Sequence, residues 1–130
     1  IMGIYENTVD GMMTDYVFPQ ENGHHEQVKW FRIGDGKDGL LCKMEEKLGL
    51  NLANYTDENL EKAQHPFEIE KADDVIIHLD YRQSGLGSNS CGEEQLEENK
   101  VKLQDFAMAF TVQAAECGTE IRKARKQYID

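Results

Sequence analysis

The sequence predicts a mainly β fold, an antiparallel β-sandwich of which this chain holds part, with one short internal helix and a C-terminal helix. Apolar and polar residues alternate in several short runs, which is the period of half-buried strands. Glycine-rich turns separate these runs, and only two segments carry helix signals. About six strands against two short helices favour a sandwich with hairpin connections.

The N-terminal part predicts two strands. Residues 1–20 have no helical period, so we expect a strand and then a loop, with Pro19 and Asn22–Gly23 marking a turn. Residues 27–33 alternate more regularly. Both faces of this run carry apolar side chains, among them Trp30 and Phe31, so we expect a strand that is partly covered on each face.

A hairpin follows. The segment Gly34–Gly39 has three glycines in six residues, which is typical of a tight connection between antiparallel strands. It leads into Leu40–Met44, the expected partner strand. Further on, Leu50–Tyr55 alternates with period two, and we expect a strand with Leu50 and Leu52 facing inward.

The internal helix is predicted from Thr56 to about Gln64. The Thr56 hydroxyl can cap the first helical turn, and the acidic Asp57 and Glu58 follow where the helix dipole is positive. The pair His65–Pro66 ends the helix, because proline disfavours a helical conformation in the residue before it.

Two more strands and a tail complete the pattern. Val75–Tyr81 predicts one strand and Lys100–Val112 another. The second strand has an apolar face that we expect in the core, formed by Phe106, Met108, Phe110 and Val112. Residues 1–112 are therefore expected to form the sandwich domain. Residues 113–130 form a tail with helical spacing at Ile121, Ala124 and Tyr128.

Composition restricts the partners. The 25 acidic and 14 basic residues give a net charge of −11, which repels phosphate backbones and argues against nucleic acid. No window approaches the roughly 20 apolar residues of a membrane helix, and the first five residues lack the basic-then-apolar layout of a signal peptide, so we expect no membrane partner. Three widely spaced cysteines, Cys42, Cys91 and Cys117, favour reduced thiols and a cytoplasmic protein.

The most informative stretch is His78–Gly92. The β-branched run Val75–Ile77 leads into this stretch, whose loop contains three glycines and three serines. This composition is typical of an ordered loop that can form part of a site. Other parts of the chain complete a pattern in the same order, namely Phe18–Gly23, Val28–Trp30, Tyr55–Thr56 and Leu60–His65. From about Ile4 to about Val112, the chain closely resembles the C-terminal sandwich domain of large multidomain bacterial β-galactosidases, of glycoside hydrolase family two.

This resemblance implies a domain of an enzyme that hydrolyses terminal non-reducing β-D-galactosides with retention. Such an enzyme needs two carboxyl groups roughly 5 Å apart, which the family carries in a separate barrel. We therefore expect no catalytic residue and no cofactor in this chain, and no turnover by the chain alone. The expected partners are the remaining domains of the parent enzyme, with galactoside bound only in the intact protein.

The resemblance also implies a sugar-contacting role for the loop. In the relatives it reaches toward the sugar pocket, and Cys91 takes the position of a residue, tryptophan or cysteine, at the substrate entrance. Asn89 and Ser90 would supply hydrogen bonds that orient the sugar, so the substrate-binding prediction is Asn89, Ser90 and Cys91. The plainer alternative is a glycine-rich loop that only closes a hairpin.

Other interpretations of the whole chain remain open. A free-standing carbohydrate-binding sandwich and a subunit-assembly module both fit the pattern, and unpaired sheet edges favour self-association into a homo-oligomer. Trp30 and Tyr81 could form a sugar platform, but aromatic residues in alternating strands more often pack in a core. His24, His25 and His78 lack a second set of ligands at metal-like spacing, so we predict no metal site.

Several smaller motifs have structural interpretations. Gly85-x-Gly87 is followed by an acidic stretch rather than a helix, which argues against a nucleotide site. We expect Glu93–Glu98 to be a solvated loop, His78 to be half-buried, and Glu21 to accept backbone N–H bonds in its turn.

Overall fold

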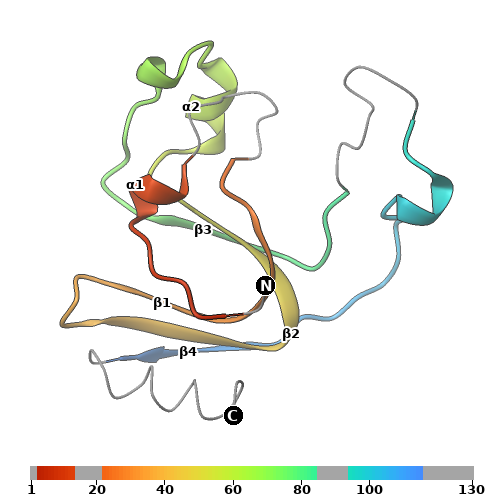
Figure 1. The fold of residues 1–130 in the computed structure, drawn as a ribbon, viewed down its shortest axis with the longest axis horizontal. Helices are drawn as coiled ribbons and strands as arrows, with labels where there is room; N and C mark the ends of the chain where they lie inside the picture. Colours follow the sequence, from red (N-terminus) through yellow and green to blue (C-terminus); the bar gives the residue numbers. More distant parts are fainter. Residues whose placement is uncertain (1–2, 14–21, 85–93, 116–130) are drawn as a thin grey trace. The chain divides into compact units, whose positions relative to one another are not determined.

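A computed structural model describes residues 3–13, 22–84 and 94–115 (Figure 1). The fold is mainly β with an antiparallel sheet and a few short helices, which confirms the predicted fold class. The strands are β1 (His25–Gly34), β2 (Gly39–Ala53), β3 (Ile76–Asp80) and β4 (Phe110–Ala114). The helices are α1 (Val9–Met12), α2 (Asp57–Lys62) and the 3₁₀ turns η1 (Pro66–Glu68) and η2 (Glu97–Asn99).

Some predictions fall outside the described residues. These are the turn at Pro19, the role of Glu21, the loop residues Asn89, Ser90 and Cys91, and the helix of the tail. Within the described residues, no helix is both long and apolar enough to cross a membrane.

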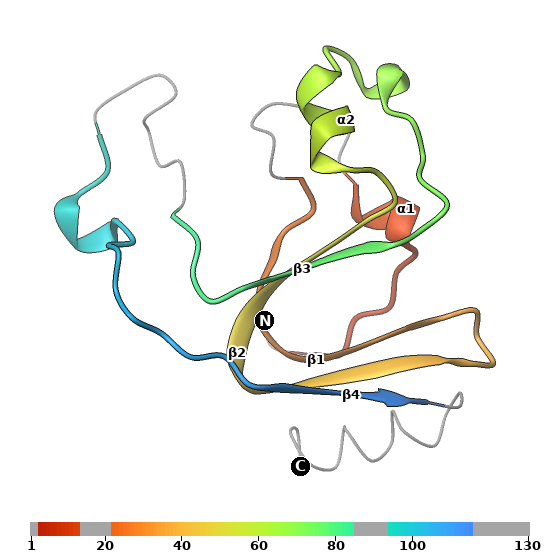
Figure 2. The same ribbon diagram turned by 180° about the vertical axis from the view of Figure 1, so that it is seen from behind.

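The four strands form one sheet in the order β1-β2-β3, and β4 pairs with β2. The β2–β4 pairing is antiparallel, with Leu40 opposite Ala114 and Met44 opposite Phe110 (Figures 1 and 2).

The chain divides into two compact units. One combines Ile1–Glu26 with Leu50–Leu79, and the other combines Gln27–Gly49 with Asp80–Asp130.

In the second unit, the predicted hairpin between β1 and β2 is confirmed. Its turn is held by Asp35, whose Oδ1 accepts the backbone N–H groups of Lys37 and Asp38, both at 2.9 Å. Gly34 and Gly39 face each other across the hairpin at very short range. A Cβ added to Gly34 would lie 2.1 Å from the Asp38 carbonyl oxygen, and one added to Gly39 would lie 2.2 Å from that of Ile33.

The core of the second unit lies along the first half of β2. Leu41 is fully buried, Cys42 and Met44 are almost fully buried, and Phe31 of β1 is slightly more exposed. Val28, Trp30 and Ile33 of β1 are partly buried, which agrees with the expected partial cover on both faces. Burial of these apolar side chains is the main source of stability in such a small unit.

In the first unit, the predicted internal helix is confirmed as α2. The Thr56 hydroxyl accepts the backbone N–H of Asn59 at 3.2 Å, and the helix ends before His65–Pro66 as expected. Leu60 and Ala63 are buried against the end of β2, in the cluster Ala53, Tyr55, Leu60 and Ala63, with Met13 and Ile69 packed against it. The cap therefore fixes the helix whose apolar face closes this small core.

One N-terminal prediction is wrong, and one mid-chain prediction holds only in part. The described residues 3–13 hold no strand but the short helix α1, because the Thr8 hydroxyl accepts the Gly11 N–H at 3.0 Å and caps a helical turn. At the end of β2, the prediction is confirmed for Leu50, which is buried, but not for Leu52, which is partly exposed. Ala53 is buried beside Leu52, because it packs against Leu60 and Ala63 of the α2 segment.

The prediction for residues 100–112 is also wrong in extent and burial. Only Phe110–Ala114 forms a strand, and the four apolar residues expected in the core are 58%, 38%, 50% and 52% exposed, in the order Phe106, Met108, Phe110 and Val112. The physical reason is that residues 100–108 pair with no strand within the described part of the chain, and the first bond to β2 runs from the Glu45 N–H to the Ala109 carbonyl. Alternation predicted one buried face, but every residue from Val101 to Val112 is exposed.

Candidate functional site

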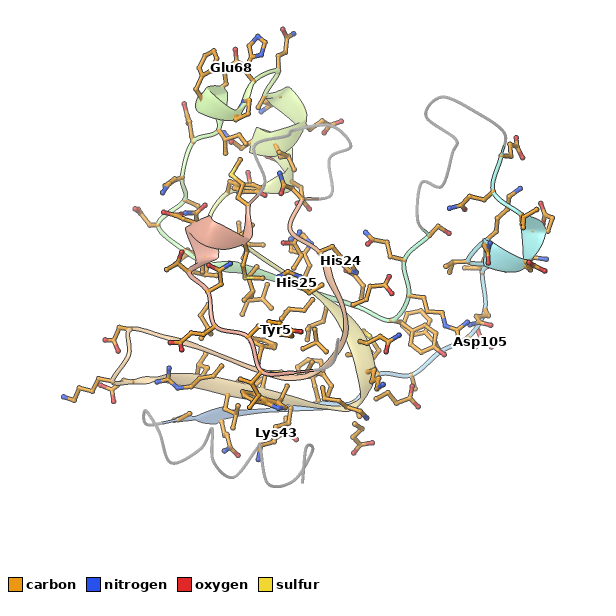
Figure 3. The ribbon with its side chains drawn as sticks, in the orientation of Figure 1. Tyr5, His24, His25, Lys43, Glu68 and Asp105 are labelled. Carbon is orange, nitrogen blue, oxygen red and sulfur yellow. The ribbon has the colours of Figure 1, made fainter. Side chains whose placement is uncertain are left out.

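The candidate site is the base of the glycine-rich loop, in the second unit. Directly after β3, the Tyr81 ring stacks on the Phe106 ring, with centroids 4.8 Å apart and planes 12° from parallel. The Arg82 guanidinium carbon lies 5.5 Å from the centroid of the Tyr81 ring, a cation–π distance. Figure 3 labels Asp105, which lies on this segment next to Phe106.

A hydrogen bond closes the base. The Ser84 hydroxyl accepts the backbone N–H of Val101 at 3.0 Å, which ties the chain entering the loop to the chain leaving it. We call Tyr81, Arg82, Ser84, Val101 and Phe106 the loop base. Residues 85–93 lie between these anchors but outside the described part of the chain, and they include the predicted substrate-binding residues.

The geometry of the loop base favours packing over direct sugar stacking by Tyr81. One face of the Tyr81 ring is used by Phe106, and the residue is partly buried. An offset aromatic pair of this kind contributes about 0.5–1.5 kcal/mol beyond the burial of its area. We therefore interpret Tyr81 as a support for the loop and not as a carbohydrate platform.

An acidic arm follows the loop. The Lys100 ammonium lies 2.6 Å from a Glu97 carboxylate oxygen and 3.3 Å from one of Glu94, and Lys102 lies 3.8 Å from Glu97. Glu94, Glu97 and Glu98 are exposed, which confirms the expected solvated acidic segment where it is described. Exposed ion pairs of this type contribute little to stability, so they shape the arm without anchoring it.

The pKa values of three described carboxyl groups are shifted, and all three are lowered. A hydrogen bond from Lys71 at 2.6 Å lowers the pKa of Asp10, and backbone N–H groups of the hairpin turn lower the pKa of Asp35. The backbone N–H of Gln64, at 2.7 Å, is the main cause of the lowered pKa of Glu68, labelled in Figure 3. A glycosidase general acid needs a raised pKa, so these carboxylates have structural roles.

The histidines His24 and His78 each lie near a different carboxylate. His78, which is half-buried as expected, lies 3.7 Å from an Asp57 carboxylate oxygen, and His24 lies 3.9 Å from Glu26. His24 and His25 are labelled in Figure 3. In the described ranges, no three His, Cys, Asp or Glu side chains gather to hold a metal ion.

Sequence reasoning missed two members of the loop base. Phe106 was expected on the core-facing side of a strand, but it stacks on Tyr81 at the base of the loop. Ser84 carried no signal, since a serine in a glycine-rich loop is ordinary and its partner, Val101, is 17 residues away along the chain. Contacts of this kind depend on how the chain returns to itself, which no local pattern encodes.

Comparisons with known proteins agree on one family. A family model described as beta galactosidase small chain matches residues 1–112. The chain is 33% identical over 109 residues to a beta-galactosidase of Actinobacillus pleuropneumoniae, covering 84% of this chain and 10% of that protein. It is 29% identical over 97 residues to a beta-galactosidase of Staphylococcus xylosus, covering 75% of this chain and 10% of that protein.

A third relative is a beta-galactosidase of Halalkalibacterium halodurans, which is 30% identical over 112 residues, covering 83% of this chain and 11% of that protein. The chain thus spans about a tenth of the length of these curated relatives.

Proposed function

The chain belongs to the β-galactosidase small-chain family, and on this premise we propose that it is one domain of an enzyme that hydrolyses terminal non-reducing β-D-galactosides. The observation that carries the proposal is the match over residues 1–112, together with relatives that are all named beta-galactosidase. The proposed parent enzyme is a retaining glycoside hydrolase of family two, which acts in the cytoplasm.

In this proposal the domain supports a catalytic centre that other domains supply. One feature supports it. The matched region amounts to about a tenth of each relative, which leaves most of those proteins for the catalytic part.

We also propose that the loop above the loop base contributes Asn89, Ser90 and Cys91 to the substrate entrance. The Tyr81–Phe106 stack and the Ser84–Val101 hydrogen bond support this, since they hold both ends of the loop. A loop fixed at its ends loses less conformational entropy when it binds a ligand, which favours its use in a binding site.

One experiment tests whether the catalytic carboxyl groups lie in other domains of the parent protein. The full-length parent protein and the isolated 130-residue chain are assayed on a chromogenic β-galactoside, and calorimetry measures binding of galactose and lactose by the isolated chain. We expect turnover by the full-length protein alone. Robust turnover by the isolated chain would refute the proposed location of the carboxyl pair. Measurable sugar binding by the isolated chain would favour a free-standing carbohydrate-binding module instead.

A second experiment tests the loop. In the full-length enzyme, Cys91→Ala is expected to raise KM several-fold with a smaller change in kcat, because the residue contacts substrate without taking part in bond cleavage. Cys117→Ala is the matched control, since it makes the same chemical change outside the matched region of residues 1–112. Identical kinetics for the two variants would reduce the loop to a scaffold.

A further inference from the structure

The ring of Phe106 connects two segments of the chain rather than filling a core. Its side chain is 58% exposed, and the residue lies outside the strands of the described sheet. The ring nevertheless stacks on that of Tyr81, which comes directly after β3. A large apolar side chain that is mostly exposed gains little from burial, so the stack itself is its main contribution.

The two cross-connections of the loop base are nested. Tyr81 contacts Phe106, and closer to the loop along the chain, the Ser84 hydroxyl accepts the N–H of Val101. Residue numbers thus rise on one side of the loop base as they fall on the other. This is the order of contacts in the two sides of an antiparallel hairpin, so we describe segments 81–84 and 101–106 as the stem of the loop.

Side chains hold this stem in place of a β ladder. In the described segments 81–84 and 101–106, neither side is a strand and no backbone-to-backbone hydrogen bond joins them. In a regular hairpin, main-chain bonds hold the two sides together whatever side chains they carry. Here the connection depends on the ring at position 106 and the hydroxyl at position 84, so a single substitution can release it.

We propose that Phe106 and Ser84 are positioning residues for galactoside binding, because they hold the two ends of the loop of residues 85–93. This inference rests on the proposed function, which assigns residues of that loop to the substrate entrance. Phe106 and Ser84 act through the loop without touching substrate. Their loss therefore weakens substrate binding and leaves the rate of bond cleavage nearly unchanged.

The test uses the full-length parent protein. Phe106→Leu removes the ring and keeps an apolar side chain, and we expect KM for a chromogenic β-galactoside to rise about 2- to 10-fold, the factor that corresponds to one aromatic pair. The change in kcat should stay within about twofold. Amide hydrogen exchange over residues 85–93, followed by mass spectrometry without substrate, should become faster.

Conservative variants test the same role. Phe106→Tyr keeps the stack and should restore both KM and the exchange rate. Ser84→Ala should change both in the same direction as Phe106→Leu, because the Val101 N–H loses its acceptor. Ser84→Thr keeps the hydroxyl and should have a smaller effect than Ser84→Ala. Loss of the effect in neither conservative variant would overturn the proposed roles of the ring and the hydroxyl.

Phe67→Leu is the matched control. Phe67 is also exposed, at 83%, and also stacks on a ring, that of His65, but it lies on η1 in the other compact unit. We expect this variant to change neither KM nor exchange over residues 85–93. Equal effects of Phe67→Leu and Phe106→Leu would indicate general destabilisation and overturn the proposal. A raised KM without faster exchange in Phe106→Leu would indicate direct contact with substrate and overturn it as well.

The exchange measurement separates this inference from the proposed function, because it does not require activity. A parent protein without β-galactosidase activity would refute the proposed function, and faster exchange in Phe106→Leu would then still support the role of Phe106 in holding the loop. An active parent protein whose KM and exchange are both unchanged by Phe106→Leu would refute the positioning role alone.

Discussion

Replacement of Leu41 by alanine tests whether β2 forms the core of the hairpin unit. The Leu41 side chain has 0% exposure, so its truncation removes burial free energy and leaves a cavity. Together these effects cost about 3 kcal/mol at a fully buried leucine. Leu40, the preceding residue on the same strand, is 47% exposed. Its truncation should cost only about 1 kcal/mol, since roughly half the burial is lost and no closed cavity forms.

Urea denaturation measures both variants. Unfolding of the chain is followed by the fluorescence of Trp30, the one tryptophan in the sequence, which is partly buried on β1. With a denaturant slope of about 2 kcal/mol/M, Leu41→Ala should lower the midpoint by about 1.5 M and Leu40→Ala by about 0.5 M. Equal shifts would contradict the placement of Leu41 in a packed interior, and with it the core assigned to this unit.

Three further predictions concern local structure. Thr56→Ala should destabilise the chain by about 1 kcal/mol through loss of the α2 cap, while Thr56→Ser restores most of it in the same urea assay. The pKa of Glu68 is lowered from its ordinary value of 4.5 in the folded chain, so the ionised carboxylate stabilises the fold fully above pH 4.5. This stabilisation is lost as the pH falls through the pKa of the folded state. Glu68→Gln should therefore reduce the loss of melting temperature at acid pH. Burial raises the pKa of Cys42, so iodoacetamide should alkylate it on the order of 10-fold or more slowly in the folded than in the urea-unfolded chain, as measured by mass spectrometry.

Elements specified by neighbouring residues were predictable from the sequence. The hairpin at Gly34–Gly39 is encoded within six residues by glycine and aspartate. The α2 helix is encoded by Thr56 at its start and His65–Pro66 after its end. In both cases the interactions that fix the structure connect residues no more than a few positions apart, so a local pattern is sufficient.

Elements specified by distant contacts were not predictable in the same way. Alternation placed Leu50 and Leu52 inward, but only Leu50 is buried, while Ala53 packs against Leu60 of α2. Alternation also predicted burial of Phe110 and Val112, which depends on a covering strand that the described residues do not contain. The side-chain period can be derived from the sequence, whereas the identity of the neighbour cannot.

The candidate site also combines features that a local pattern predicts with features that depend on distant contacts. The glycine-rich composition of residues 84–92 and its resemblance to a known family indicated where a site would lie. The loop base could not be anticipated, because the bond from Val101 to Ser84 and the stack of Phe106 on Tyr81 join residues 17 or more positions apart. The roles of Asn89, Ser90 and Cys91 stay predictions.

The facing glycines of the β1–β2 hairpin restrict how this protein can be re-engineered. Any side chain at Gly34 or Gly39 would strike the opposite main chain, so both positions are closed to mutagenesis libraries even though they lie near a surface turn. Gly36, at the tip, has open space around it, although its φ of +95° disfavours other residues. A reporter peptide inserted between Gly36 and Lys37 would avoid both close approaches, but it would separate Asp35 from the Lys37 and Asp38 N–H groups that hold the turn.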